Sequence, residues 1–153
     1  YGVHESYYAN GNLRNKGSYQ NGQAEGLHEY YHSNGRLELT GSHAQGKRDG
    51  VHLEYVSSGV LVRKITYKDG KRNGIFESYY ENGELAITYN SLNGKTDGLS
   101  KAYNDNGLLV STTKYKSGKR DGLQVHYING KVDSTGCYKD DHATDHSYCS
   151  KQP

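Results

Sequence analysis

Histidines recur at one fixed position of this chain. His4, His28 and His52 stand 24 residues apart, and imidazole nitrogens are common ligands of zinc. If each histidine belongs to a separate pair of strands, however, neighbouring histidines lie roughly 10 Å apart, because adjacent strands are ~4.8 Å apart. Zinc-bound nitrogens lie only ~2.1 Å from the metal. The spacing therefore favours an inherited repeat over a metal site, and it leaves these rings as candidates for contact with a partner.

Both cysteines of the chain lie near its C-terminus, at positions 137 and 149. We expect a Cys137–Cys149 disulfide that ties the tail to the last repeat, which would indicate an oxidising compartment such as the bacterial periplasm. A zinc set made of Cys137, His142, His146 and Cys149 is the rival interpretation. It has suitable ligand types but lacks the usual paired Cys-x2-Cys spacing. Free thiols are a third alternative.

Basic residues occupy corresponding turns along the chain. They are Lys47, Arg48, Lys71, Arg72, Lys95, Lys119 and Arg120. We expect them to line one edge of a sheet, where they could meet phosphates or an acidic protein. The same turns contain Asp49, Asp97 and Asp121, which offset the charge. Simple solvation of the turns is therefore the alternative to a basic interface.

Signals of catalysis are weak. The sequence lacks a Gly-x-Ser-x-Gly elbow and a glycine-rich loop that would cradle phosphate at the start of a helix. Glu5, Glu29 and Glu77 recur one per unit, so they should lie too far apart to act as paired carboxylates. The sequence thus predicts a protein that is not an enzyme and has no cofactor.

All these residues belong to a repeat of 24 residues. Its units open at Gly2, Gly26, Gly50, Gly74, Gly98 and Gly122. In each unit two strand-like runs are separated by glycine turns such as Asn10-Gly11 and Asn21-Gly22, and Asn-Gly is a strong hairpin signal because both residues accept positive φ. The pattern predicts an all-β fold, an elongated single-layer antiparallel β-meander built from six two-stranded repeats. The array should cover residues 1–145, with a degenerate last unit, and residues 146–153 should form a tail.

Strand alternation assigns side chains to two faces. We expect the core to consist of three columns at odd distance from the opening glycine: Tyr7, Tyr31, Tyr55, Tyr79, Tyr103 and Tyr127; Leu13, Leu37, Leu61, Leu85, Leu109 and Val132; and Tyr19, Tyr67, Tyr115 and Tyr138. Tyr89 comes two residues early in the last of these columns, so a bulge or weak pairing is expected near Asn90. The opposite face would expose the candidate partner-binding residues His4, Tyr8, His28, Tyr30, His32, His52, Phe76 and Tyr80. Shielding of the sheet from water is the alternative role for these rings.

Composition limits the classes of function. Only 32% of the 153 residues are hydrophobic, but 16 tyrosines and the regular turns argue against disorder. A net charge of +2 is too small to indicate nucleic acid or an anionic membrane as partner. The repeat is already in phase at Gly2, so we expect that a signal peptide or lipoprotein segment was removed, or that the chain was trimmed. The periplasm or cell envelope is the expected location, with the cytoplasm as the alternative.

The pattern Gly-x4-Tyr-x3-Gly-x-Leu, closed by Gly-Lys-x-Asp-Gly, resembles the variant form of the MORN (membrane occupation and recognition nexus) repeat over residues 2 to 145. Bacterial arrays of this type look like YwqK-type antitoxins and immunity proteins. The resemblance implies a protein partner, a cognate toxin such as a phospholipase effector, and no catalytic residue. The alternatives are a membrane-apposed or structural scaffold and a lipid or glycan binder.

Overall fold

The computed structural model describes residues 2–152, and almost all of its regular structure is strand. The strands are β1 (Gly2–Tyr7), β2 (Leu13–Gln20), β3 (Gln23–Tyr31), β4 (Leu37–Ala44), β5 (Lys47–Arg48), β6 (Gly50–Tyr55), β7 (Leu61–Lys68), β8 (Lys71–Tyr79), β9 (Leu85–Leu92), β10 (Lys95–Thr96), β11 (Gly98–Tyr103), β12 (Leu109–Lys116), β13 (Lys119–Ile128), β14 (Lys131–Lys139) and β15 (His142–Ala143). One short helix, α1 (His146–Ser150), follows them. The predicted all-β, single-layer antiparallel meander is confirmed.

Two-residue turns with left-handed backbone join many of the strands. At Asn21-Gly22 the φ angles are 52° and 76°, as in the turns whose twist matches that of a hairpin. Gln45 and Ser117 adopt the same conformation immediately before a glycine, at φ 51° and 50°. Glycine therefore takes the second place in these turns while the residue before it varies, except in the last turn, where Asp140 and Asp141 have φ angles of 48° and 69°.

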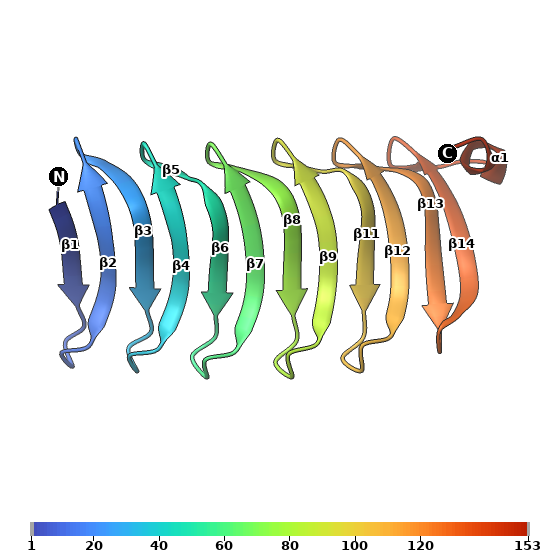
Figure 1. The fold of residues 1–153 in the computed structure, drawn as a ribbon. Helices are drawn as coiled ribbons and strands as arrows, with labels where there is room; N and C mark the ends of the chain where they lie inside the picture. Colours follow the sequence, from blue (N-terminus) through green and yellow to red (C-terminus); the bar gives the residue numbers. More distant parts are fainter. Residues whose placement is uncertain (1, 153) are drawn as a thin grey trace. The chain divides into compact units, whose positions relative to one another are not determined.

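Two compact units divide the chain after Asn73. In the first unit the strands neighbour one another in the order β1-β2-β3-β4-β6-β7, and the short β5 pairs with β4. In the second unit the order is β8-β9-β11-β12-β13-β14-β15, and β10 pairs with β9. Within each unit, the longer loops lie along one margin of the sheet and the tight turns along the other, except that the tight turn between β13 and β14 lies on the margin of the longer loops (Figure 1).

A bulge marks the opening glycine of the repeats. Gly17 opposes His28 while Ser18 opposes Glu25, so β3 has two extra residues, Gly26 and Leu27. Gly26 has a φ of 72°, in the left-handed region that glycine enters without strain. Gly50, Gly74, Gly98 and Gly122 also have positive φ. The recurrence of glycine every 24 residues thus reflects a bend of the backbone.

This bulge also accounts for the pairing near Asn90. The ladder between β8 and β9 is regular through Asn90, which opposes Ile75. On the other side of β9, the pairing breaks between Thr88 and Ser91, where the chain passes from β11 to β10. The predicted weakness is therefore confined to one side of β9. Its cause is the bend at Gly98, not the displaced Tyr89.

The predicted core was wrong in an important respect. A second bulge lies in β2, where Asn15 opposes Ser6 but Leu13 opposes Tyr7. It inverts the alternation of side chains, so Leu13 and Tyr19 lie on opposite faces although both are odd-numbered. Tyr7 is 54% exposed, and Tyr67 is the one member of the three predicted columns that is fully buried among the described residues. The buried residues are Ile65, Tyr67, Phe76, Val125, Cys137, His28, His52, Ser91, Thr112, Thr113 and Asp121.

Candidate functional site

Aromatic and imidazole rings form a continuous row across the first unit. We call this set the ring row: His4, Tyr19, His28, His43, His52 and Tyr67. Each ring meets the next edge-on, with centroids 4.7 to 5.4 Å apart. His28 and His52 are only 3% and 2% exposed. The expectation that these two histidines would be exposed for a partner is therefore wrong, because they form the packed interior of one face.

Glycines make room for the two buried histidines. A Cβ atom on Gly17 would lie 2.1 Å from Nδ1 of His28, and one on Gly41 would lie 2.1 Å from Nδ1 of His52. Each imidazole lies over the bare glycine and donates from Nε2 to a carbonyl, of Ser18 and Ser42 respectively, at 2.9 Å. The sequence contains Gly17 and Gly41 at equivalent places of two repeats. It does not show that each opposes a histidine, because the bulge at the opening glycine shifts the register.

His43 lies between the two buried histidines. Its Nδ1 is buried and has no hydrogen-bond partner. Burial lowers the pKa of His43 below its ordinary value of 6.5, and positive charge on His28, His52 and Arg48 would lower it further. Burial also lowers the pKa of His52, partly opposed by its bond to the Ser42 carbonyl. Burial thus disfavours the charged forms of His43 and His52, which suits packing.

Phe76 replaces histidine at the equivalent position of the second unit. It is 9% exposed and stacks on Tyr89, with centroids 4.5 Å apart and ring planes inclined by 17°. Tyr89 opposes Phe76 in register, at the place that Gly17 takes opposite His4. This position explains why Tyr89 comes two residues early. Phe76 is therefore a core residue, and its predicted exposure was also wrong.

Tyr8, His32 and Tyr80 stabilise the longer loops. Their polar atoms donate to backbone carbonyls of the next repeat, at 2.5 Å to Tyr31, 2.9 Å to Tyr55 and 2.7 Å to Tyr103. Asparagines add parallel bonds, from Asn10 to Ser33, from Asn34 to Ser57 and from Asn82 to Asp105. These side chains have a packing role, contrary to expectation. Of the eight predicted contact residues, His4 and Tyr30 remain exposed without such a role.

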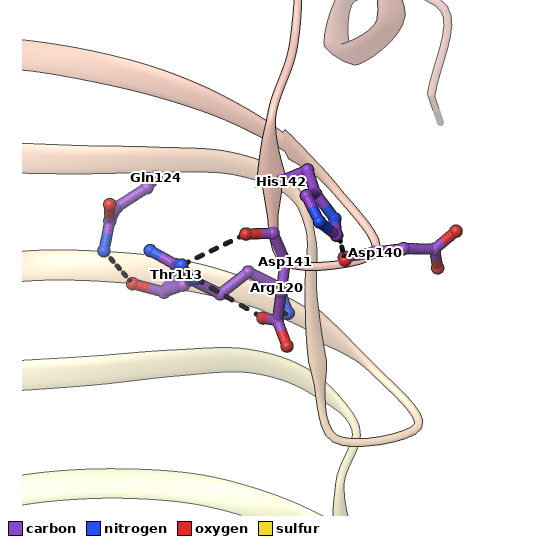
Figure 2. Close-up of polar contacts among 6 residues, drawn as sticks. All are labelled: Thr113, Arg120, Gln124, Asp140, Asp141 and His142. Carbon is purple, nitrogen blue, oxygen red and sulfur yellow. Dashed lines mark hydrogen bonds and ion pairs between the residues drawn. The ribbon is translucent and has the colours of Figure 1, made fainter.

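The predicted basic edge divides into packed arginines and exposed lysines. The Arg48 guanidinium lies 5.2 Å from the Tyr67 ring centroid and donates to its hydroxyl at 3.0 Å. Arg120 lies 4.2 Å from the Tyr138 ring centroid and binds Asp141 (Figure 2). These contacts from Arg120, first of all its backbone N–H, lower the pKa of Asp141. Lys47, Lys71, Lys95 and Lys119 are exposed, while Arg72 is half-buried.

Cys137 and Cys149 form the predicted disulfide, with their Cα atoms 6.0 Å apart. Both sulfurs of the rival zinc set are thereby joined to each other. His142 is close to the Asp140 carbonyl at 2.8 Å (Figure 2), and His146 contacts the Thr135 hydroxyl at 3.1 Å. Within residues 2–152, no group of three or more His, Cys, Asp or Glu side chains could hold a metal ion.

An exposed aliphatic side chain follows the opening glycine of every repeat. We call this set the aliphatic row: Val3, Leu27 and Val51 in the first unit, and Ile75, Leu99 and Leu123 in the second. The three in the first unit are 45 to 58% exposed, and the three in the second are 38 to 50% exposed. Each comes directly before the residue two places after the opening glycine, such as His4, His28 or Phe76, so it points to the opposite face. Sequence reasoning missed this row, although Gly-Val, Gly-Leu or Gly-Ile opens all six units.

The side chains of the aliphatic row are suited to contact with another molecule. Exposed aliphatic side chains on a regular sheet suit burial against another macromolecule, since contiguous apolar surface on a protein marks sites of interaction. Among the described residues, no helix is long and apolar enough to cross a membrane.

Comparison with protein families supports the repeat. The family model described as the MORN repeat variant matches residues 1–21, 48–69 and 72–93. A search of curated proteins found no match to the chain.

Proposed function

Because the model of the MORN repeat variant matches three segments of this chain, we propose that the chain is a non-enzymatic protein-binding module. Its most specific role would be that of a bacterial immunity or antitoxin protein, which binds a cognate secreted toxin and occludes it. A phospholipase effector is one such toxin. A disulfide supports an oxidising compartment such as the periplasm, where such a complex would form.

The observation that carries this proposal is the aliphatic row. The polar side chains that looked available for a partner are largely used inside the fold, whereas Val3, Leu27 and Val51 remain exposed. A side chain that recurs in every repeat and keeps 38 to 58% of its surface exposed is available to an external surface. Burying such side chains is favourable by roughly 25 cal/mol for each Å² of apolar area.

Other surfaces contribute less to the proposal. Tyr30 is 36% exposed on the face opposite the aliphatic row and remains a candidate contact with His4. The exposed lysines Lys47, Lys71, Lys95 and Lys119 form an alternative interface for an acidic partner.

Co-expression with the toxin encoded next to this chain's gene tests the proposal. We expect the chain to restore growth of cells that produce the toxin and to co-purify with it at a fixed ratio. A chain that neither protects the cells nor forms the complex would contradict the proposal. Binding of the isolated chain to liposomes in that case would favour the membrane-apposed scaffold.

A further inference from the structure

We propose that Ile75, Leu92 and Leu99 form a seat for an acidic amphipathic helix of a partner protein, an inference that rests on the proposed protein-binding function. These three side chains come from the neighbouring strands β8, β9 and β11 of the second unit. They are 48 to 53% exposed. We call them the aliphatic seat.

The chain's own helix α1 shows how this face receives a helix. Cys149 is bonded to Cys137, and His146 contacts the Thr135 hydroxyl at 3.1 Å. Cys137 and Thr135 are two residues apart on β14, so their side chains share one face. Cys137 opposes Leu123 in register, and directly opposed residues point to the same side. Helix α1 therefore lies on the face that carries the aliphatic row.

Polar anchors hold α1 on this face. The Tyr148 hydroxyl donates to Oδ1 of Asp121 at 2.5 Å, and the Gln152 amide donates to the same oxygen at 3.0 Å. The Lys139 ammonium lies 5.5 Å from the centroid of the Tyr148 ring. Asp121 is buried beneath these groups. The last repeat thus has, on the face that carries Leu123, a carboxylate that accepts a hydrogen bond from α1.

The same features recur one repeat earlier without a covering helix. Leu99 and Asp97 stand 24 residues before Leu123 and Asp121. Leu99 is more exposed than Leu123, at 48% against 38%. The aliphatic seat therefore continues a surface on which a helix already lies, and continuity of that kind indicates the same type of occupant.

The spacing of the seat matches a helix that crosses the strands. Equivalent residues of successive repeats are roughly 9.6 Å apart, since two strands separate them. Seven residues of an α-helix rise about 10.5 Å. A helix with apolar residues at i and i+7 would contact Leu99 and Ile75 while it crosses β9 over Asn90, which opposes Ile75. An apolar residue at i+3 would lean toward Leu92, which lies two residues farther along β9 on the same side.

The positive charge of the lysines on this face favours an acidic helix as the occupant. Lys114 opposes Leu99 in register, and Lys101 opposes Thr112 on the same side. Lys116 alternates with Lys114 and shares that side. Glu77 and Asp97 are the acidic residues near the seat, and both already accept hydrogen bonds, Glu77 from the Tyr79 hydroxyl at 2.8 Å and Asp97 from the Ser117 N–H at 3.2 Å. Acidic side chains flanking the apolar stripe of the partner helix would meet the lysines.

A synthetic helical peptide tests this inference on the full chain. The probe carries leucine at i, i+3 and i+7 with glutamate on its flanks, and its binding is followed by fluorescence anisotropy. We expect saturable binding that weakens at least about tenfold in Leu99→Ser and in Leu92→Lys. Leu27→Ser, at the equivalent position of the first unit, is the matched control and should change binding less than twofold. A peptide with lysine in place of glutamate should bind at least about tenfold more weakly.

Two results would overturn the seat. One is absence of peptide binding, and the other is equal binding by Leu99→Ser, by Leu27→Ser and by the wild-type chain. Toxin co-purification reports separately on the proposed function. A toxin complex that persists in Leu99→Ser would refute the seat and retain the function, whereas peptide binding without any toxin complex would refute the function and retain the seat.

Discussion

At the scale of single residues, each buried histidine packs against a glycine. His52 is buried because Gly41 presents bare backbone to its ring, and the imidazole then satisfies the Ser42 carbonyl. His28 and Gly17 repeat the arrangement with Ser18. The histidines that looked like ligands or contact residues are therefore explained by packing and by one hydrogen bond each.

Replacing Gly41 tests this pairing. In Gly41→Ala the new methyl group would overlap the His52 ring, so we expect a loss of about 1–3 kcal/mol in the free energy of unfolding from overpacking. Chemical denaturation measures it. Gly2→Ala is the control, because no atom lies within 4 Å of a Cβ at that position. Equal stability of the two variants would refute the pairing.

His43 should make the stability of the first unit depend on pH. Its pKa is lowered in the folded chain, chiefly by burial, and His28, His52 and Arg48 face it. The unfolded chain therefore binds protons at pH values where the folded chain does not. Stability from this group is fully present above 6.5 and is lost as the pH falls below that value.

A tyrosine at this position removes the titration. His43→Tyr should reduce the dependence of the unfolding midpoint on pH between about 7.5 and 5 and leave the part that comes from His52, whose pKa burial also lowers. Tyrosine suits this site, since Tyr19 and Tyr67 occupy the equivalent places in the ring row. His4→Gln, at the exposed end of that row, should retain the wild-type dependence. An unchanged slope in His43→Tyr would show that other groups control it.

Bulges decide what can be predicted at the scale of strands. The 24-residue period of the glycines was sufficient to predict the order and direction of the strands, because Asn-Gly turns and strand-like runs repeat along the whole chain. Assignment of the faces failed at Leu13, where a bulge changes which side a residue points to without changing its number. Bulges leave little trace in one sequence, so Tyr19 was placed on the wrong face, and the face of His28 and Phe76 was expected to be exposed although it is packed.

Loop contacts give a prediction at the same scale. Tyr80→Phe removes the hydroxyl that donates to the Tyr103 carbonyl, and we expect a loss of about 0.5–1.5 kcal/mol in unfolding free energy. Tyr30→Phe, on the exposed face of β3, should change stability by less than about 0.5 kcal/mol. Urea unfolding of both variants compares them, and a larger effect at Tyr30 would contradict the loop role of Tyr80.

The disulfide should stabilise mainly the last strands. It closes a loop between residues 12 apart, and removal by Cys137→Ser with Cys149→Ser should cost roughly 2–3 kcal/mol. Hydrogen exchange should rise in α1 and β14 and stay unchanged in β1 to β4. A uniform rise across the chain would indicate that the bond supports more than the C-terminal region.

At the scale of the whole molecule, polar side chains such as Tyr8 and Tyr80 bond to the next repeat, and the aliphatic side chain after each opening glycine stays exposed. The proposed binding function therefore rests on the aliphatic row. Identification of the partner from sequence was limited, because the repeat period specifies a scaffold while the partner depends on the surface that the scaffold exposes.

The affinity of the chain for the cognate toxin proposed as its partner tests this account most directly. We predict that Leu27→Ser combined with Leu99→Ser weakens the complex at least tenfold, about 1.4 kcal/mol, while the chain stays folded. Lys47→Ser combined with Lys119→Ser, on the exposed turns, should leave the dissociation constant within about twofold. The account is contradicted if the lysine variant loses the toxin and the leucine variant binds it as tightly as the wild-type chain.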